Sequence, residues 1–220
     1  MGKLLNVISS LHKRTKRDYL KRMTDDKVAC MKVANKYGFD YWDGDRRYGY
    51  GGYKYDGRWK TVAQKLISYY GLKKNARILD VGCGMAHLLF EFQKLLPEIK
   101  VVGFDISKYA ISHAVQKVKP FLHLHKAQNR YEYPDRYFDL VISINTLHNL
   151  TVYDLKTALT EIERVGKRKY IVVESFRNER ELFNLQCWAL TCQSFFAKDE
   201  WIWLFKQFGY GGDYEFNYFE

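Results

Sequence analysis

One glycine-rich stretch, LDVGCGMAHLL at residues 79–89, has residue types and a spacing that suit a nucleotide-like ligand. Gly82 and Gly84 let the backbone turn tightly and leave space above it for a ligand. The sixth position of a dinucleotide-binding GxGxxG motif is His87 here rather than glycine. Asp80 precedes the first glycine by two residues, and a carboxylate there would repel a pyrophosphate but could orient an amine.

A second acid, Asp105, lies in the apolar run VVGFDIS, 23 residues after Gly82. An acid about 20 residues beyond the first glycine of such a loop hydrogen-bonds ribose hydroxyls. The GK[ST] sequence of a phosphate-binding loop is absent. The two acids therefore predict a ligand with a ribose and an amine but no phosphate, a description that S-adenosylmethionine fits.

The residues around these motifs predict the elements that must position them. From residue 77 onward, apolar runs alternate with segments of helical spacing, and the expected strands are RILDVG, KVVGFDIS, FLHLHKA, FDLVISIN and KYIVVES. Strands that alternate with helices form a mostly parallel sheet covered on both faces. Two further candidates, LTCQSFF and DYEFNYFE, predict an antiparallel pair at the C-terminal edge and seven strands in total.

Residues 1–70 lack this alternation, so we expect an N-terminal extension before a ligand-binding domain at residues 71–220. The pattern is helical up to about residue 37, and the aromatic, glycine-rich YWDGDRRYGYGGYKYDGRW follows at residues 41–59. Because the predicted fold has an open cleft, we hypothesise that this segment is a lid and acceptor wall, although aromatic packing with surface arginines is the alternative. The lid hypothesis assigns arginines to an anionic acceptor and aromatics to excluding water: Arg46, Arg47, Arg58, Tyr48, Tyr50, Tyr53 and Trp59.

From residue 77 to its end, the chain resembles the class I S-adenosylmethionine-dependent methyltransferases. The resemblance rests on LDVGCGMAHLL, VVGFDIS and YPDRYFDLVISINTLHNL, followed by KRKYIVVES and KDEWIWLFKQFGY. It implies a doubly wound, Rossmann-like α/β fold and these cofactor-binding residues: Asp80, Gly82, Cys83, Gly84, Asp105 and Ile106. The acid that often follows the third strand is missing here, so Gln128 is the candidate for that contact.

The ends of the fourth and fifth strands supply the candidates for the acceptor side. His148 follows the fourth strand and could act as general base for a hydroxyl acceptor, with helix capping as the alternative. Asn145 could contact cofactor or acceptor, with a turn position as the alternative. Glu174 ends the fifth strand and either faces the cleft or pairs with a basic neighbour.

The composition narrows the class of partner. A formal net charge of +11 favours acidic partners. The four cysteines form no CxxC pair and the six histidines no HxxxH array, which predicts reduced thiols in a cytoplasm and no metal site. No run reaches the roughly 18 apolar residues of a membrane helix. The amphipathic N-terminus leaves a homodimer or a contact with an anionic membrane surface open.

The stretches DYWDGDRRYGYGGY and SINTLHNL are similar to those of small bacterial methyltransferases associated with surface-polysaccharide (capsule) modification. This resemblance implies O-methylation of a small anionic acceptor: a sugar, a nucleotide-linked group, or a phosphoramidate or phosphoryl group. An RNA or protein methyltransferase is one alternative, although SINTLHNL does not resemble the NPPY-type motif of enzymes that methylate base amines. A non-catalytic scaffold that binds S-adenosylmethionine is the other, and the intact Asp80 and Asp105 disfavour it.

Overall fold

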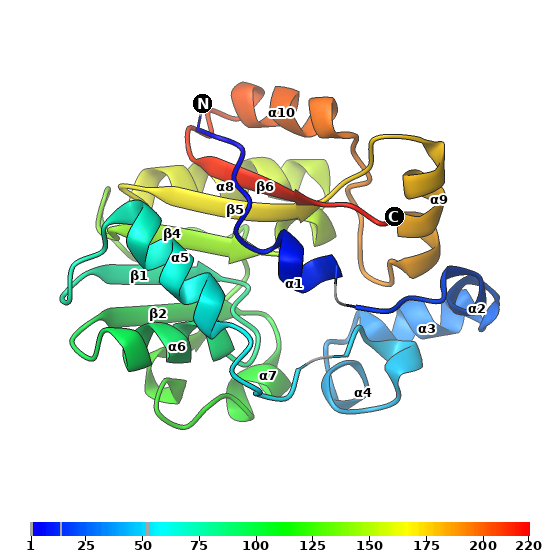
Figure 1. Cartoon of the computed structure of the whole chain (residues 1–220), viewed down its shortest axis with the longest axis horizontal. Coiled ribbons are helices and arrows are strands. Elements are labelled where there is room, and N and C mark those ends of the chain that lie inside the picture. Colours follow the sequence, from blue (N-terminus) through cyan, green and yellow to red (C-terminus); the bar gives the residue numbers. More distant parts are fainter. Residues whose placement is uncertain (1, 14, 52) are drawn as a thin grey trace.

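The computed structural model describes residues 2–13, 15–51 and 53–220, and these residues build one sheet with helices on both faces (Figure 1). The sheet has six strands in the order β3-β2-β1-β4-β5-β6. Every neighbouring pair is parallel. The strands are β1 (Arg77–Val81), β2 (Lys100–Asp105), β3 (Leu122–Leu124), β4 (Leu140–Ile144), β5 (Lys169–Glu174) and β6 (Asp213–Asn217).

The expectation of seven strands with an antiparallel C-terminal edge is wrong. Within the described residues β6 alone follows β5, and the two are parallel, with Tyr170 opposite Asp213. The helix α10 (Lys198–Gln207) returns the chain to the starting end of β5, and helical crossovers of this kind join parallel strands. The strand expected at residues 190–196 is irregular chain instead, and its N–H groups at Gln193 and Ser194 donate to the carbonyl of His148.

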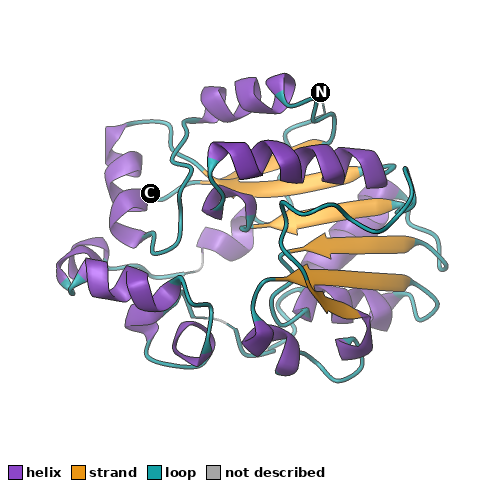
Figure 2. Ribbon diagram, turned by 180° about the vertical axis from the view of Figure 1, so that it is seen from behind, coloured by secondary structure: helices purple, strands orange, loops and turns teal. Residues whose placement is uncertain are grey.

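The helices form a layer on each face of the sheet (Figures 1 and 2). The first layer contains α5 (Lys60–Tyr70) and α6 (His87–Leu95), and the second contains α8 (Val152–Val165) and α10. Side chains of one strand alternate between the two cores, so that Ile78 joins the first and Leu79 the second. The remaining helices are α1 (Ser9–Lys13), α2 (Tyr19–Thr24), α3 (Lys27–Ala34), α4 (Phe39–Trp42), α7 (Lys108–Ser112) and α9 (Glu179–Trp188), with 3-10 turns at Arg46–Tyr48, Lys119–Phe121 and Leu147–Asn149.

The start of the chain covers the outer edge of β6. Leu5 N–H donates to the carbonyl of Tyr214 at 2.9 Å, and Tyr214 N–H donates to the carbonyl of Lys3 at 3.0 Å. The buried carboxylate of Glu215 then accepts hydrogen bonds from the backbone N–H groups of residues 7–9. Covering the edge prevents it from pairing with another chain. The helical pattern expected up to residue 37 therefore becomes an extended start and three short helices.

Candidate active site

The glycine-rich loop directly follows β1, at the carboxyl ends of the parallel strands. Gly82 has φ +81°, and a Cβ there would lie 2.0 Å from Thr146 Oγ1, so no other residue fits without movement. The N–H groups of Gly82 and Cys83 donate to the carbonyl of Phe104 at 2.7 and 2.9 Å. The loop is thereby fixed against β2 and carries Asp80 and Gly84 to the same cavity.

Two buried carboxyl groups face this cavity. Asp105 Oδ2 accepts from Gly84 N–H at 2.7 Å, and Oδ1 accepts from Ser107 N–H at 2.8 Å. Each oxygen keeps a further lone pair for a ligand. Burial first, and the charge of Asp105 second, raise the pKa of Asp80 to about 8. No hydrogen bond to the Asp80 carboxyl occurs among the described residues.

The residues expected beside an adenine lie on one side of the cavity. Ile106 directly follows β2 and leaves 50% of its surface exposed, which is unusual for an isoleucine at a strand end. Gln128 lines the cavity from the loop after β3, together with Lys126 and Ala127. Cys83 also lines it, and burial raises the pKa of its thiol well above the ordinary range, so this thiol stays protonated.

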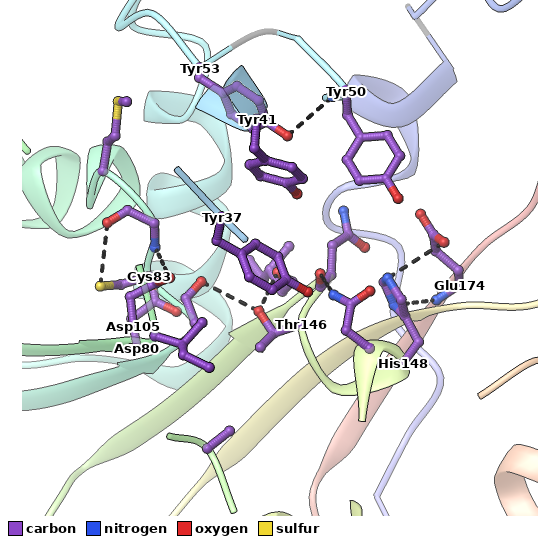
Figure 3. Close-up of a pocket in the computed structure, with 18 of the residues that line it drawn as sticks. Tyr37, Tyr41, Tyr50, Tyr53, Asp80, Cys83, Asp105, Thr146, His148 and Glu174 are labelled. Carbon is purple, nitrogen blue, oxygen red and sulfur yellow. Dashed lines mark hydrogen bonds and ion pairs between the residues drawn. The ribbon is translucent and has the colours of Figure 1, made fainter. Parts of the chain in front are cut away.

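Aromatic side chains of the 41–59 segment lie over the cavity (Figure 3), with Gly52 outside the described residues. The Trp42 ring lies against Gly84, where a Cβ would be 2.8 Å from Cη2. Trp42 Nε1 donates to Ser107 Oγ at 2.9 Å, and the Tyr41 and Tyr53 rings stack with centroids 5.5 Å apart. The start of the segment is thus held against the loop after β2.

The structure divides the residues of the lid hypothesis into two groups. Four line the cavity: Tyr50, Tyr53, Arg58 and Trp59. Three lie outside it: Arg46, Arg47 and Tyr48. The Arg47 guanidinium pairs with Asp25 at 2.7 Å, and the Arg46 guanidinium lies 5.6 Å from the Trp188 ring centroid. Tyr48 packs beside the small buried cluster formed by α3 and residue 190. Adjacent positions in a 3-10 turn point in different directions, so sequence proximity did not place these side chains together.

His148 and Glu174 form a buried pair at the far end of the cavity (Figure 3). His148 Nδ1 accepts a hydrogen bond from the backbone N–H of Glu174 at 3.2 Å, and Nε2 lies 3.5 Å from Glu174 Oε2. Because Nδ1 accepts, the neutral ring carries its hydrogen on Nε2. Burial lowers the pKa of His148 to about 3 and raises that of Glu174 to about 7. Glu174 is therefore the member of the pair that exchanges a proton near neutral pH.

Asn145 links the two ends of the cavity. It has φ +55°, a left-handed conformation that asparagine tolerates better than most residues. Its Oδ1 accepts from Asn217 Nδ2 at 2.7 Å, which leaves the Asn145 amide nitrogen free to donate to a ligand. This side chain is thus held in place by β6, at the side of the cavity between the glycine-rich loop and Glu174.

The cavity has a volume of about 540 Å³ and includes residues that the motifs did not indicate. These include His12, Arg17, Asn35, Tyr37, Tyr41, Trp42, Trp188 and Phe219. Most come from segments outside the strand–helix alternation, and only Tyr41 and Trp42 carried a signal, as members of the aromatic stretch.

In the described part of the chain no helix is long and apolar enough to cross a bilayer, and no three His, Cys, Asp or Glu side chains are grouped to hold a metal.

The fold and the loop together define a class of protein. A parallel α/β sheet with a glycine-rich loop after β1 and an acid at the end of β2 is the arrangement of the class I S-adenosylmethionine-dependent methyltransferases. Solved structures share this fold. The YcgJ protein of Bacillus subtilis aligns with a TM-score of 0.54 and 19% identity over 66% of each chain. A Haloferax volcanii methyltransferase, solved with the activator Trm112, aligns with a TM-score of 0.57 and 16% identity, over 89% of this chain and 77% of its own.

A family model described as a methyltransferase domain matches residues 72–209, and the chain belongs to this family. An uncharacterised methyltransferase of Schizosaccharomyces pombe is 31% identical over 49% of this chain and 41% of its own length. A mitochondrial arginine-hydroxylase of Rattus norvegicus is 28% identical over 50% of this chain and 31% of its own length. The chain thus spans less than half the length of these curated relatives. Family and fold imply S-adenosylmethionine as the cofactor.

Proposed function

We propose that the protein transfers the methyl group of S-adenosylmethionine to a hydroxyl group of a small anionic acceptor. One observation carries the proposal: a single cavity of about 540 Å³ extends from Asp80 and Asp105 to Glu174. Cavities that hold small ligands and cofactors measure roughly 300–1,000 Å³. The glycine-rich loop and an acid–base residue therefore share one cavity, as a transfer between two bound molecules requires.

The residues at the loop end fit the cofactor. Asp105 has lone pairs left for ribose hydroxyls, and Ile106 offers an exposed apolar surface for a flat ring. Asp80 is a buried carboxyl without a hydrogen-bond partner among the described residues, and a positively charged amine would satisfy it. When bound, S-adenosylmethionine supplies a methyl group already activated on a sulfonium.

Glu174 takes the proton of the acceptor hydroxyl in this proposal, and His148 orients the carboxylate. A carboxyl whose pKa is raised to about 7 is a far better base than an ordinary glutamate and still ionises near neutral pH. His148 has its Nδ1 lone pair occupied, and its Nε2 atom lies 3.5 Å from Glu174 Oε2, which has no hydrogen-bond partner among the described residues. We therefore propose Glu174 as the general base, in place of His148, which the sequence suggested.

The aromatic segment closes the cavity around the acceptor. Burial raises the pKa of Tyr50 and Tyr53 far above their ordinary value, so both stay neutral and act as walls and hydrogen-bond donors. A lid of this kind keeps water from the reacting atoms. A volume of about 540 Å³ favours a sugar-sized or phosphoryl-bearing acceptor over RNA or a folded protein. The proposal that this acceptor belongs to surface-polysaccharide synthesis in the cytoplasm rests on the sequence resemblance.

The proposal is tested with cofactor labelled in its methyl group and a panel of acceptors analysed by mass spectrometry. The panel contains neutral sugars, sugar phosphates, nucleotide-linked sugars and phosphoramidates, with RNA and protein substrates as the alternatives. We expect label in an acidic small molecule, at an oxygen. Label in RNA or protein alone would replace the proposal with that alternative. Cofactor binding without transfer to any panel member would favour a non-catalytic role.

A further inference from the structure

Arg17 is an arginine of the cavity wall without a carboxylate partner. It lies between α1 and α2, in the segment that Figure 1 shows beside the carboxyl ends of the central strands. No carboxylate oxygen of the described residues lies within 4.0 Å of its guanidinium. The other arginine that lines the cavity, Arg58, is already paired with Asp56. A partly buried charge is costly unless something pairs with it.

The guanidinium of Arg17 is held rigidly by groups that leave its charge unneutralised. Its Nη1 donates to the carbonyl of Thr15 at 3.1 Å, and its Nη2 donates to the carbonyl of His12 at 3.2 Å. Nη2 also contacts His12 Nδ1 at 3.2 Å, whose ring donates from Nε2 to the carbonyl of Tyr218. Burial and the charge of Arg17 lower the pKa of His12 to about 4, so this ring stays neutral and accepts the bond.

Two aromatic rings and one orphaned N–H group complete the site. The Arg17 guanidinium carbon lies 5.6 Å from the Trp188 ring centroid and 5.1 Å from that of Phe219, and both rings also line the cavity. The Arg17 Nε atom is buried and has no hydrogen-bond partner within residues 2–13, 15–51 and 53–220. A fixed guanidinium with an unused donor is suited to a phosphoryl or carboxylate oxygen.

We propose that Arg17 forms an anion subsite of the acceptor pocket, which takes the phosphoryl or carboxylate group of the methyl acceptor. This inference rests on the proposed function and moves its anion contact from residues 46, 47 and 58 to the segment between α1 and α2. Glu174 lies near enough to interact electrostatically with Arg17. The acceptor would then place its anion at Arg17 and its reacting hydroxyl at Glu174.

The test measures binding of inorganic phosphate, glucose 6-phosphate and glucose by calorimetry, with S-adenosylhomocysteine at saturation. We expect both phosphates to bind more tightly than glucose. Loss of a charge-assisted hydrogen bond should weaken phosphate binding about tenfold or more in Arg17→Gln. Arg17→Lys should retain part of the affinity. Arg47→Gln is the matched control, because Arg47 pairs with Asp25 outside the cavity, and it should bind as the unaltered protein does.

A second readout avoids any dependence on how the variants fold. In the unaltered protein, the Arg17 Nε–H signal in a ¹H–¹⁵N spectrum should shift as phosphate is added. Equal phosphate affinity in Arg17→Gln, or an Nε–H signal that stays still at saturating phosphate, would overturn the subsite. If S-adenosylhomocysteine fails to bind while the phosphate-dependent shift persists, the proposed function is lost and the anion subsite stands. If S-adenosylhomocysteine binds and phosphate does not, the anion subsite is lost and the proposed function stands.

Discussion

The backbone N–H of Glu174 donates to Nδ1 of His148 at 3.2 Å, which leaves the ring's one hydrogen on Nε2, 3.5 Å from Oε2 of the same glutamate. The sequence made His148 the candidate base and placed Glu174 only at the cleft or in an ion pair. In the proposed reaction, Glu174 takes the proton from the acceptor and His148 orients the carboxylate. The two roles predict different kinetic effects.

Replacing Glu174 should remove proton transfer without removing the cofactor. Glu174→Gln is expected to lower kcat by about 10²–10⁴, the usual contribution of a general base, with unchanged S-adenosylhomocysteine affinity. The rate of the unaltered protein should rise with pH through about 7, as the Glu174 carboxyl ionises. His148→Leu should shift that rise to higher pH, because an apolar side chain replaces a polar ring 3.5 Å from the carboxylate and disfavours its charged form. A pH–rate profile measures both effects, and an unchanged profile in His148→Leu would remove its orienting role.

Cofactor binding should release a proton from Asp80. The pKa of Asp80 is raised to about 8, mainly by burial, so the carboxyl is largely protonated at pH 7 before binding. A positively charged amine or sulfonium nearby favours the carboxylate, so affinity should rise with pH and level off above about 8. Calorimetry in buffers of different ionisation enthalpy detects the released proton directly. Asp80→Asn should bind more weakly and release none; continued release would place the proton on another group.

Two of the six described glycines at positive φ should differ in how much stability a substitution to alanine costs. Gly57 has φ +76° with open space around its Cβ position, so Gly57→Ala should lose about 1–2 kcal/mol from backbone strain alone. Gly82→Ala has the same strain and also drives Cβ into Thr146, which should add about 1–3 kcal/mol. Urea unfolding measures both losses. Equal losses would mean that the loop can move away from Thr146.

Trp42 should contribute to cofactor affinity from the lid. Trp42→Ala removes the ring that lies against Gly84 and the hydrogen bond to Ser107 Oγ, and we expect S-adenosylhomocysteine affinity to fall roughly tenfold. Trp42→Phe retains a ring and should lose less. Trp203→Ala is the control, since Trp203 is 58% exposed on α10 and far from the cavity lining. Equal affinities in Trp42→Ala and Trp203→Ala would exclude the lid from cofactor binding.

The residues that the sequence predicted for the cofactor all line one cavity, because their signals are local. The spacing of Asp80, Gly82 and Gly84 within one turn, and the position of Asp105 at the end of the next strand, each depend on a few neighbouring residues. The strands from β1 to β5 were likewise recognisable as apolar runs. The direction of β6 was not, because the same alternating residues suit a parallel or an antiparallel neighbour, and only the path of α10 decides.

The acceptor end could not be predicted in the same way. Arg17 reaches the cavity because Glu215 and the edge of β6 hold the start of the chain across the carboxyl ends of the strands. The sequence instead made Arg46 and Arg47 the candidates, yet the 3-10 turn directs them toward Trp188 and Asp25. Contacts between segments some 200 residues apart leave no local pattern to read.

The most direct test of the account is a crystal structure of the protein with S-adenosylhomocysteine. We predict ribose hydroxyls within hydrogen-bond distance of Asp105, the adenine over Ile106, and the sulfur facing Asn145 and Glu174. Co-crystallisation with glucose 6-phosphate should add a phosphate at Arg17 in the same cavity. Ligand bound elsewhere, or an adenine at the Glu174 end, would contradict the assignment of both the cofactor site and the acceptor pocket.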